Sequence, residues 1–240
     1  MLKALAAGIV AASALAPQAP TQQALTEQEC TVGDAVITWG FKESFRSYIS
    51  GSIAQGEWLV DGDVAYETPH FRFEQGTGSI SPDRSQGNIR YEGSFIFTGH
   101  AGILETQLSN PSLSFTSDST ATLFLDVQGD TMDELSVARD GVAFATVSWA
   151  DESVAPEAGT LLIKEASVVL TEEGSSAFGT YPEGESLDPM DIALTVTPGC
   201  LAQPQQPWAL VLGALGLGAL VSVMGLVFTR VRKSREQGRQ

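Results

Sequence analysis

The sequence predicts an all-β fold, an antiparallel sandwich or barrel-like domain with one short N-terminal helix, followed by one C-terminal transmembrane helix. Three observations predict the β-fold. Most of residues 56–198 alternates between apolar and polar side chains, its short segments are rich in β-branched and aromatic residues, and Gly, Pro or acidic residues end them. About ten strands fit into this region, which is the size of a sandwich or barrel-like domain.

The expected strands place apolar side chains on one face. In "HFRF" the aromatic rings of Phe71 and Phe73 point the same way, and in "SFIFTG" those of Phe95 and Phe97 do. The segments "TATLFLDVQG", "VAFATVSWA", "ASVVLTE" and "DIALTVTP" continue the pattern. One side of the sheet therefore faces a core.

Two Asp-Gly pairs predict hairpins. Asp61-Gly62 lies between "GEWLV" and "DVAYET", and Asp140-Gly141 lies between "LSVAR" and "VAFATV". Asp-Gly readily adopts the positive φ angles of a type I′ turn. We therefore expect each pair to join two neighbouring strands.

The segment from Trp39 to Ile49, "WGFKESFRSYI", has the periodicity of a helix. Its apolar positions recur at the spacing of one helical face: Phe41, Phe45, Tyr48 and Ile49. Thr38 is suited to cap its start, and Gly51 follows its end, where glycine is favoured. Ser44 and Tyr48 are four residues apart and point the same way, so the helix presents a hydroxyl and a phenol together.

Both ends of the chain resemble membrane-targeting segments. Lys3 precedes the apolar run "ALAAGIVAASALA", which predicts a cleaved signal peptide over residues 1–24. Residues 208–228 contain no charge and, at about 1.5 Å per residue, extend roughly 32 Å, enough to cross a bilayer. Residues 229–240 are basic and predict a cytoplasmic tail. An exported domain over residues 25–203 and a Pro/Gln spacer over 204–207 remain.

The exported domain is strongly acidic. Between residues 25 and 203 it has 7 Lys or Arg and 28 Asp or Glu, so its formal net charge is 7 − 28 = −21. This charge disfavours nucleic acid and anionic lipid surfaces as partners. The acidity also has a simpler explanation, which is the solubility of an exported domain.

The chain has two cysteines, Cys30 and Cys200, at the two ends of the predicted domain. Export permits a disulfide between them. The bridge would close a loop of about 170 residues and, by the chain-entropy argument, add at most about 4–5 kcal/mol. Two free thiols are the alternative.

Enzyme motifs are absent from the sequence. It has no G-x-S-x-G elbow, P-loop or dinucleotide fingerprint, and two cysteines with two histidines make no zinc-finger or zincin pattern. Ser44 and His100 could suggest a hydrolase, but no motif supplies an oxyanion hole. We therefore expect a binding protein and not an enzyme.

Three segments, taken in order, resemble one family. "WGFKESFRSYISGSIAQGEW", "FTGHAGILETQLSNPSL" and "AFGTYPEGESLDPMDIAL" are similar to segments of the HtaA domain, the heme-binding module of actinobacterial heme-uptake proteins. The resemblance covers about residues 30–200. One such domain before a membrane anchor resembles the HtaB-like members.

The resemblance implies roles for individual residues. Tyr48 matches the tyrosine that ligates ferric heme b, and His100 matches the histidine that hydrogen-bonds this tyrosine. Ser44 matches a serine near a heme propionate. Phe178 or Tyr181 falls where an aromatic ring flanks the porphyrin, and the sequence leaves open which of them does.

Elementary chemistry is consistent with these roles. Tyrosine is an established axial ligand of ferric heme, and a cation stabilises the phenolate form of the phenol. A histidine bonded to the phenolate orients the ligand. Phe41 and Phe45 are expected to supply apolar walls for the porphyrin, and Lys42 and Arg46 are expected to be either propionate donors or solvated charges.

The resemblance implies a function at the cell surface. A single-pass membrane protein of this family would bind heme in heme and iron uptake. Its expected partners are other HtaA-type proteins, the heme-binding lipoprotein of an ABC importer, and host hemoproteins as heme donors. The alternative is an adhesion or envelope-scaffolding domain that does not bind heme.

Overall fold

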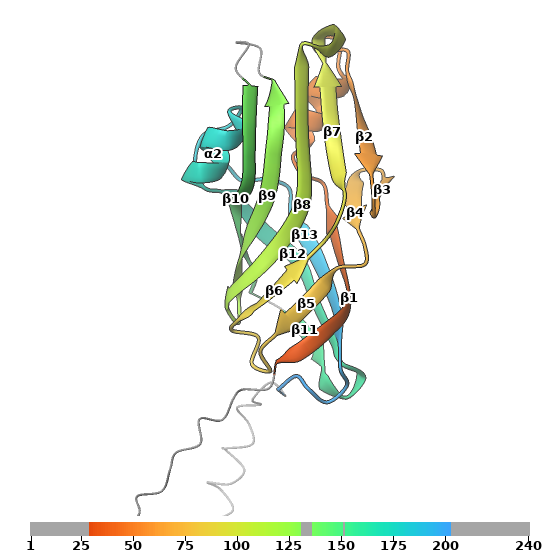
Figure 1. Cartoon of the computed structure of the whole chain (residues 1–240), viewed down its shortest axis with the longest axis vertical. Coiled ribbons are helices and arrows are strands. Elements are labelled where there is room, and N and C mark those ends of the chain that lie inside the picture. The colour runs from red at the N-terminus through yellow and green to blue at the C-terminus, as the bar shows by residue number, and fades with distance from the viewer. Residues whose placement is uncertain (1–28, 131–135, 151, 203–240) are drawn as a thin grey trace, which may run out of the picture.

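The computed structural model describes residues 29–130, 136–150 and 152–202 and shows a mostly β domain (Figure 1). Its strands form one sheet of 13 strands, three more than the roughly ten expected, and the ladders between these strands are antiparallel. The prediction of an antiparallel all-β domain is confirmed.

The strands are β1 (Cys30–Trp39), β2 (Glu57–Asp61), β3 (Val64–Glu67), β4 (His70–Phe73), β5 (Thr77–Ile80), β6 (Gly87–Arg90), β7 (Ser94–Gly99), β8 (Leu104–Ser117), β9 (Thr120–Asp130), β10 (Ser136–Ser148), β11 (Glu152–Ala155), β12 (Thr160–Leu170) and β13 (Met190–Val196). The helices are α1 (Glu43–Ser50) and α2 (Glu172–Phe178), with the 3₁₀ turns η1 (His100–Gly102) and η2 (Pro156–Ala158).

Eight of these strands close into a ring. Following the hydrogen-bonded neighbours, the ring runs β1, β5, β6, β8, β9, β10, β12, β13 and back to β1. Outside the ring, β7 and β2 extend the sheet from β8, β4 and β3 extend it from β1, and β11 lies on β12. The barrel-like part of the prediction is therefore also correct.

Neither predicted hairpin forms. Asp61-Gly62 is a turn between β2 and β3, but β2 pairs with β7 and β3 pairs with β4. Asp140-Gly141 lies inside β10, where the register with β9 shifts between Arg139 and Val142. Gly141 has a φ of 62°, so the positive φ angle that suggested a turn serves a bulge in one continuous strand.

Aromatic side chains fill the core between α1, α2 and the sheet. Phe41 has no exposed surface, and its ring contacts lie 5.2–6.3 Å away, centroid to centroid. These contacts are Trp39, Phe45, Phe95, Phe97, Phe144 and Phe178. As predicted, Phe71 and Phe73 are buried on one face of β4. The cluster fixes both helices against the strands.

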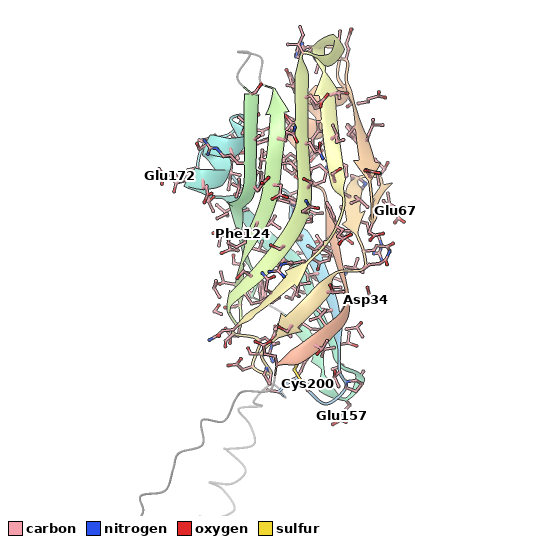
Figure 2. The ribbon with its side chains drawn as sticks, in the orientation of Figure 1. Asp34, Glu67, Phe124, Glu157, Glu172 and Cys200 are labelled. Carbon is pink, nitrogen blue, oxygen red and sulfur yellow. A yellow bond between two sulfur atoms is a disulfide. The ribbon has the colours of Figure 1, made fainter. Side chains whose placement is uncertain are left out.

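The two ends of the domain are joined by the predicted disulfide. Cys30 and Cys200 are bonded, with a sequence separation of 170 residues. Figure 2 places Cys200 at the end of the sheet opposite η1, so both domain termini lie away from that tip. Of the labelled carboxylates, Glu172 lies on one side of the molecule, Glu67 and Asp34 lie on the other, and Glu157 lies at the lower end (Figure 2).

The predicted signal peptide, transmembrane helix and basic tail lie outside the described residues. Within the described ranges, no helix has both the length and the apolar character that a membrane crossing requires.

We expect Gly56→Ala to destabilise the tip of the domain. A Cβ on Gly56 would lie 1.8 Å from the backbone oxygen of Thr98, so the segment after α1 would have to move away from β7. The expected loss is about 1–2 kcal/mol in the free energy of unfolding, measured by denaturation followed through tryptophan fluorescence. Gly33→Ala is the control, because a Cβ there meets nothing within 4 Å. Equal stability of the two variants would contradict the close packing at Gly56.

Candidate functional site

Helix α1 positions the phenol at the candidate site, and Asp188 holds the start of that helix. The helix begins at Glu43 and not at Trp39, which ends β1. The N–H of Glu43 donates to Asp188 Oδ1 over 2.9 Å, and Arg46 Nη2 donates to Asp188 Oδ2 over 2.9 Å. Asp188 therefore satisfies an otherwise free helix N–H, a role the sequence had suggested for Thr38.

Tyr48 and His100 form a hydrogen-bonded pair. The phenol oxygen lies 2.6 Å from His100 Nε2, and both side chains are half-buried. Their ring centroids are 5.9 Å apart. The two residues are 52 positions apart in sequence, so the fold brings together the pair that the resemblance implied.

The backbone around His100 adopts an unusual conformation. His100 has a φ of 52° and Ala101 a φ of 57°, so two consecutive non-glycine residues are left-handed. Each such residue costs about 1–2 kcal/mol. The N–H of His100 donates to the carbonyl of Ala54 over 2.7 Å, which ties η1 to the segment after α1. This turn aims the imidazole at α1.

Ser44 faces a different partner from Tyr48. Its Oγ lies 3.0 Å from the hydroxyl of Tyr181. Lys42 Nζ donates to Glu185 Oε1 over 2.6 Å and stands 5.4 Å from the centroid of the Tyr181 ring. Lys42 and Arg46 are thus in partly buried ion pairs, so neither is the solvated charge that was one of the two expectations.

Phe178 and Tyr181 stack on each other at the end of α2. Their ring centroids are 6.1 Å apart and their planes differ by 21°. Phe178 is buried, whereas Tyr181 is only partly buried. Tyr181 is held by its own carbonyl, which accepts a hydrogen bond of 2.8 Å from Ser175 Oγ in α2. Tyr181 is therefore the outer ring, and Phe178 supports it from the core.

Phe41 and Phe45 do not line an open surface. Phe41 is 0% exposed and Phe45 is 2% exposed, so neither has surface to offer a ligand. The expectation that they contact the porphyrin directly is corrected here. Phe45 lies 6.3 Å from Tyr48 and 6.5 Å from Tyr181, centroid to centroid, so it supports both rings from beneath.

Two of the large exposed hydrophobic residues lie on the backbone segments that hold His100. Ile53 is 73% exposed and Ile103 is 56% exposed. Ile53 precedes Ala54, whose carbonyl accepts the His100 N–H, and the Ile103 N–H donates to the His100 carbonyl over 3.4 Å. Exposed apolar side chains are therefore present on both of these segments.

A separate hollow on another face of α1 is acidic. Arg46, His70, Asp188 and Asp191 are among the residues that line it. Burial alone would raise the pKa of Asp191, but hydrogen bonds from Lys164 and from the N–H of Glu165 hold it below its ordinary value. Asp191 is thus anionic at neutral pH, and the hollow is unsuited to an acidic ligand. His70 is exposed.

Sequence reasoning missed four residues of this region. Asp188 and Glu185 belong to the third quoted segment, but a capping carboxylate that is distant in sequence carries no local signal. Ile53 and Ile103 carried only the weak signal of apolar residues shortly after a glycine, Gly51 and Gly102.

The chemistry of the pair is that of a single oxygen ligand. In the described parts of the chain, no group of three or more His, Cys, Asp or Glu could hold a metal ion. Tyr48 offers one phenol oxygen, whose phenolate form a bound cation would favour. Ile53, Ile103 and the partly buried ring of Tyr181 offer apolar surface to a ligand.

Known proteins are similar to this chain in sequence and in fold. The HtaA family, described as Htaa, matches residues 34–193. The C-terminal domain of HtaA from Corynebacterium glutamicum is 34% identical, with a TM-score of 0.64, over 70% of this chain and 99% of that domain. The N-terminal domain of the same protein is 29% identical, with a TM-score of 0.60, over 70% of this chain and 99% of that domain.

A third structure shares the fold. The heme binding protein HtaB from Corynebacterium glutamicum is 23% identical, with a TM-score of 0.52, over 71% of this chain and 96% of that protein. No curated protein matches this sequence. Since the family match spans 160 of the 240 residues (193 − 34 + 1 = 160) and the fold agrees, this chain belongs to the HtaA family.

Proposed function

We propose that this protein binds ferric heme through the phenolate of Tyr48, with His100 as its hydrogen-bond partner, and relays heme in iron uptake. The observation that carries the proposal is the 2.6 Å bond between Tyr48 and His100 Nε2. A related protein of the same fold is described as a heme binding protein.

The single oxygen ligand is the first support for heme over a free metal ion. A bare iron ion needs several protein ligands, and Tyr48 has one candidate partner, His100, that is already bonded to its oxygen. The porphyrin would bring four nitrogen ligands of its own. Tyr48 would complete the coordination from one side, as tyrosine does in other heme proteins.

The hydrogen bond between Tyr48 and His100 also provides an acceptor for the phenol proton of Tyr48. With Nε2 bare, the phenol donates to it, and with Nε2 protonated, the imidazole donates to a phenolate. Binding to Fe(III) favours the phenolate, because bound cations stabilise deprotonated ligands. His100 would then accept the proton and keep the oxygen oriented toward iron.

The remaining groups suit the two edges of heme. The hydroxyls of Ser44 and Tyr181 lie together at the start of α1, where they are suited to bind the heme propionates. The exposed side chains of Ile53 and Ile103 would contact the apolar edge of heme. Tyr181, the outer of the two stacked rings, is the aromatic residue proposed to flank the porphyrin. Phenolate prefers Fe(III) to Fe(II), so reduction would loosen the bond, which suits a carrier that hands heme on.

The proposed setting is the cell surface. Residues 1–24 would be removed as a signal, and residues 208–228 would anchor the domain with the basic tail in the cytoplasm. Heme would come from host hemoproteins or other HtaA-type proteins and pass toward the lipoprotein of an ABC importer. The role is binding and transfer, not catalysis.

A hemin titration of the purified full chain tests the proposal. Detergent is included because residues 208–228 are predicted to span a membrane, and a detergent blank is subtracted. The expected result is a saturable absorbance change with one hemin per chain. No change beyond the blank would contradict heme binding and favour a surface scaffold.

A further inference from the structure

Lys42, Ser44, Tyr181 and Glu185 form a connected polar cluster at the start of α1. Lys42 Nζ is 2.6 Å from Glu185 Oε1, and Ser44 Oγ is 3.0 Å from the Tyr181 hydroxyl. Lys42 also stands 5.4 Å from the centroid of the Tyr181 ring, so the two contacts are neighbours. The ammonium group of Lys42 is thus already paired with a carboxylate of the protein, that of Glu185.

Two cations, Lys42 and Arg46, lie at the start of α1. Of these, Lys42 can exchange its carboxylate partner for a ligand with the smaller loss of folding stability. Arg46 is bonded to Asp188, which also satisfies the N–H of Glu43, so Arg46 and the helix start share one anchor. Lys42, by contrast, keeps a second bond of 2.6 Å to the carbonyl of Ser186. If Glu185 moves away, Lys42 remains in place.

The ion pair of Lys42 with Glu185 is weak enough to be displaced. Their side chains are 17% and 32% exposed, so water screens the attraction. Pairs of this kind shift an equilibrium constant by only about two- to fivefold. A ligand carboxylate that is held nearby by other contacts can therefore replace Glu185 on Lys42.

We propose that Glu185 is a competing carboxylate, which holds Lys42 in the empty domain and gives way to a carboxylate of the ligand. Lys42 and Ser44 then fix the acidic edge of the porphyrin, so binding favours porphyrins with free carboxylates, and Glu185 reduces that preference because it competes for Lys42. This inference rests on the proposed function. It also explains how a domain of net charge −21 accommodates an acidic ligand.

The test compares hemin with its dimethyl ester, which has the same ring and iron but no free carboxylate. Glu185→Gln in the full chain is expected to tighten hemin binding about two- to fivefold at low ionic strength and to leave binding of the ester unchanged. Affinities are measured by absorbance titration in the same solvent and detergent.

Glu183→Gln is the matched control. Glu183 is exposed, lies two residues from Glu185, and makes no ion pair within the described part of the chain. It removes the same charge without touching Lys42, so it is expected to change hemin affinity less than Glu185→Gln does.

The outcomes separate this inference from the proposed function. If the wild-type chain does not bind hemin, the proposed function fails and the inference falls with it. If the wild type binds hemin, three results overturn the inference alone: no gain from Glu185→Gln, an equal gain with the ester, or an equal gain from Glu183→Gln.

Discussion

Tyr48→Phe is expected to abolish tight hemin binding and to leave the fold intact. Phenylalanine keeps the ring that packs 6.3 Å from Phe45, centroid to centroid, and removes only the oxygen that is proposed to bind iron. The loss should exceed about 100-fold in the dissociation constant, the upper end of what losing a partner of a metal ligand costs. An absorbance titration measures it.

The matched control for this variant is Tyr66→Phe. Tyr66 is also a partly buried tyrosine, but it lies on β3 and packs against Trp58 and Phe71. The Tyr66→Phe variant should bind hemin with the affinity of the wild type. Unchanged affinity of Tyr48→Phe would remove Tyr48 as the ligand, whatever else the domain binds.

His100→Asn is expected to weaken hemin binding about 10–100-fold, which is less than Tyr48→Phe. Asparagine tolerates the left-handed backbone that His100 adopts at φ 52°, so the turn should persist. Its shorter side chain does not reach the phenol oxygen. The remaining tyrosine can still bind iron, but nothing accepts its proton.

Hemin titrations of His100→Asn and Tyr48→Phe, followed by absorbance, distinguish the two roles. In the wild type, His100 is expected to receive the phenol proton, whereas in His100→Asn that proton must go to solvent. A loss equal to or larger than that of Tyr48→Phe would contradict the assignment of His100 as a supporting group.

Alternation along the chain was enough to predict the sheet, but not its pairing. The burial of Phe71 and Phe73 follows directly from a period of two. The pairing of β2 with β7 and of β3 with β4 does not follow from this period, because packing in the aromatic core determines it and the turn at Asp61-Gly62 does not. At Gly141 the Asp-Gly pair correctly predicted a positive φ angle, but this residue forms a bulge within β10 and not a hairpin turn.

The site was predictable where residues lie on one helix and unpredictable where the fold brings distant segments together. Ser44 and Tyr48 share a side of α1 by spacing alone. That the Tyr48 oxygen meets His100 came from the family resemblance, and the structure places them 2.6 Å apart. Asp188 and Glu185, more than 140 residues from their partners on α1, had no signal in local sequence.

The most direct test of the central claim is resonance Raman spectroscopy of the ferric hemin complex of the full chain, prepared with ordinary and with ring-deuterated tyrosine. We predict enhanced bands of an iron-bound tyrosinate that shift on deuteration and are absent from Tyr48→Phe. A wild-type complex without such bands, or the same bands in Tyr48→Phe, would contradict iron binding by Tyr48.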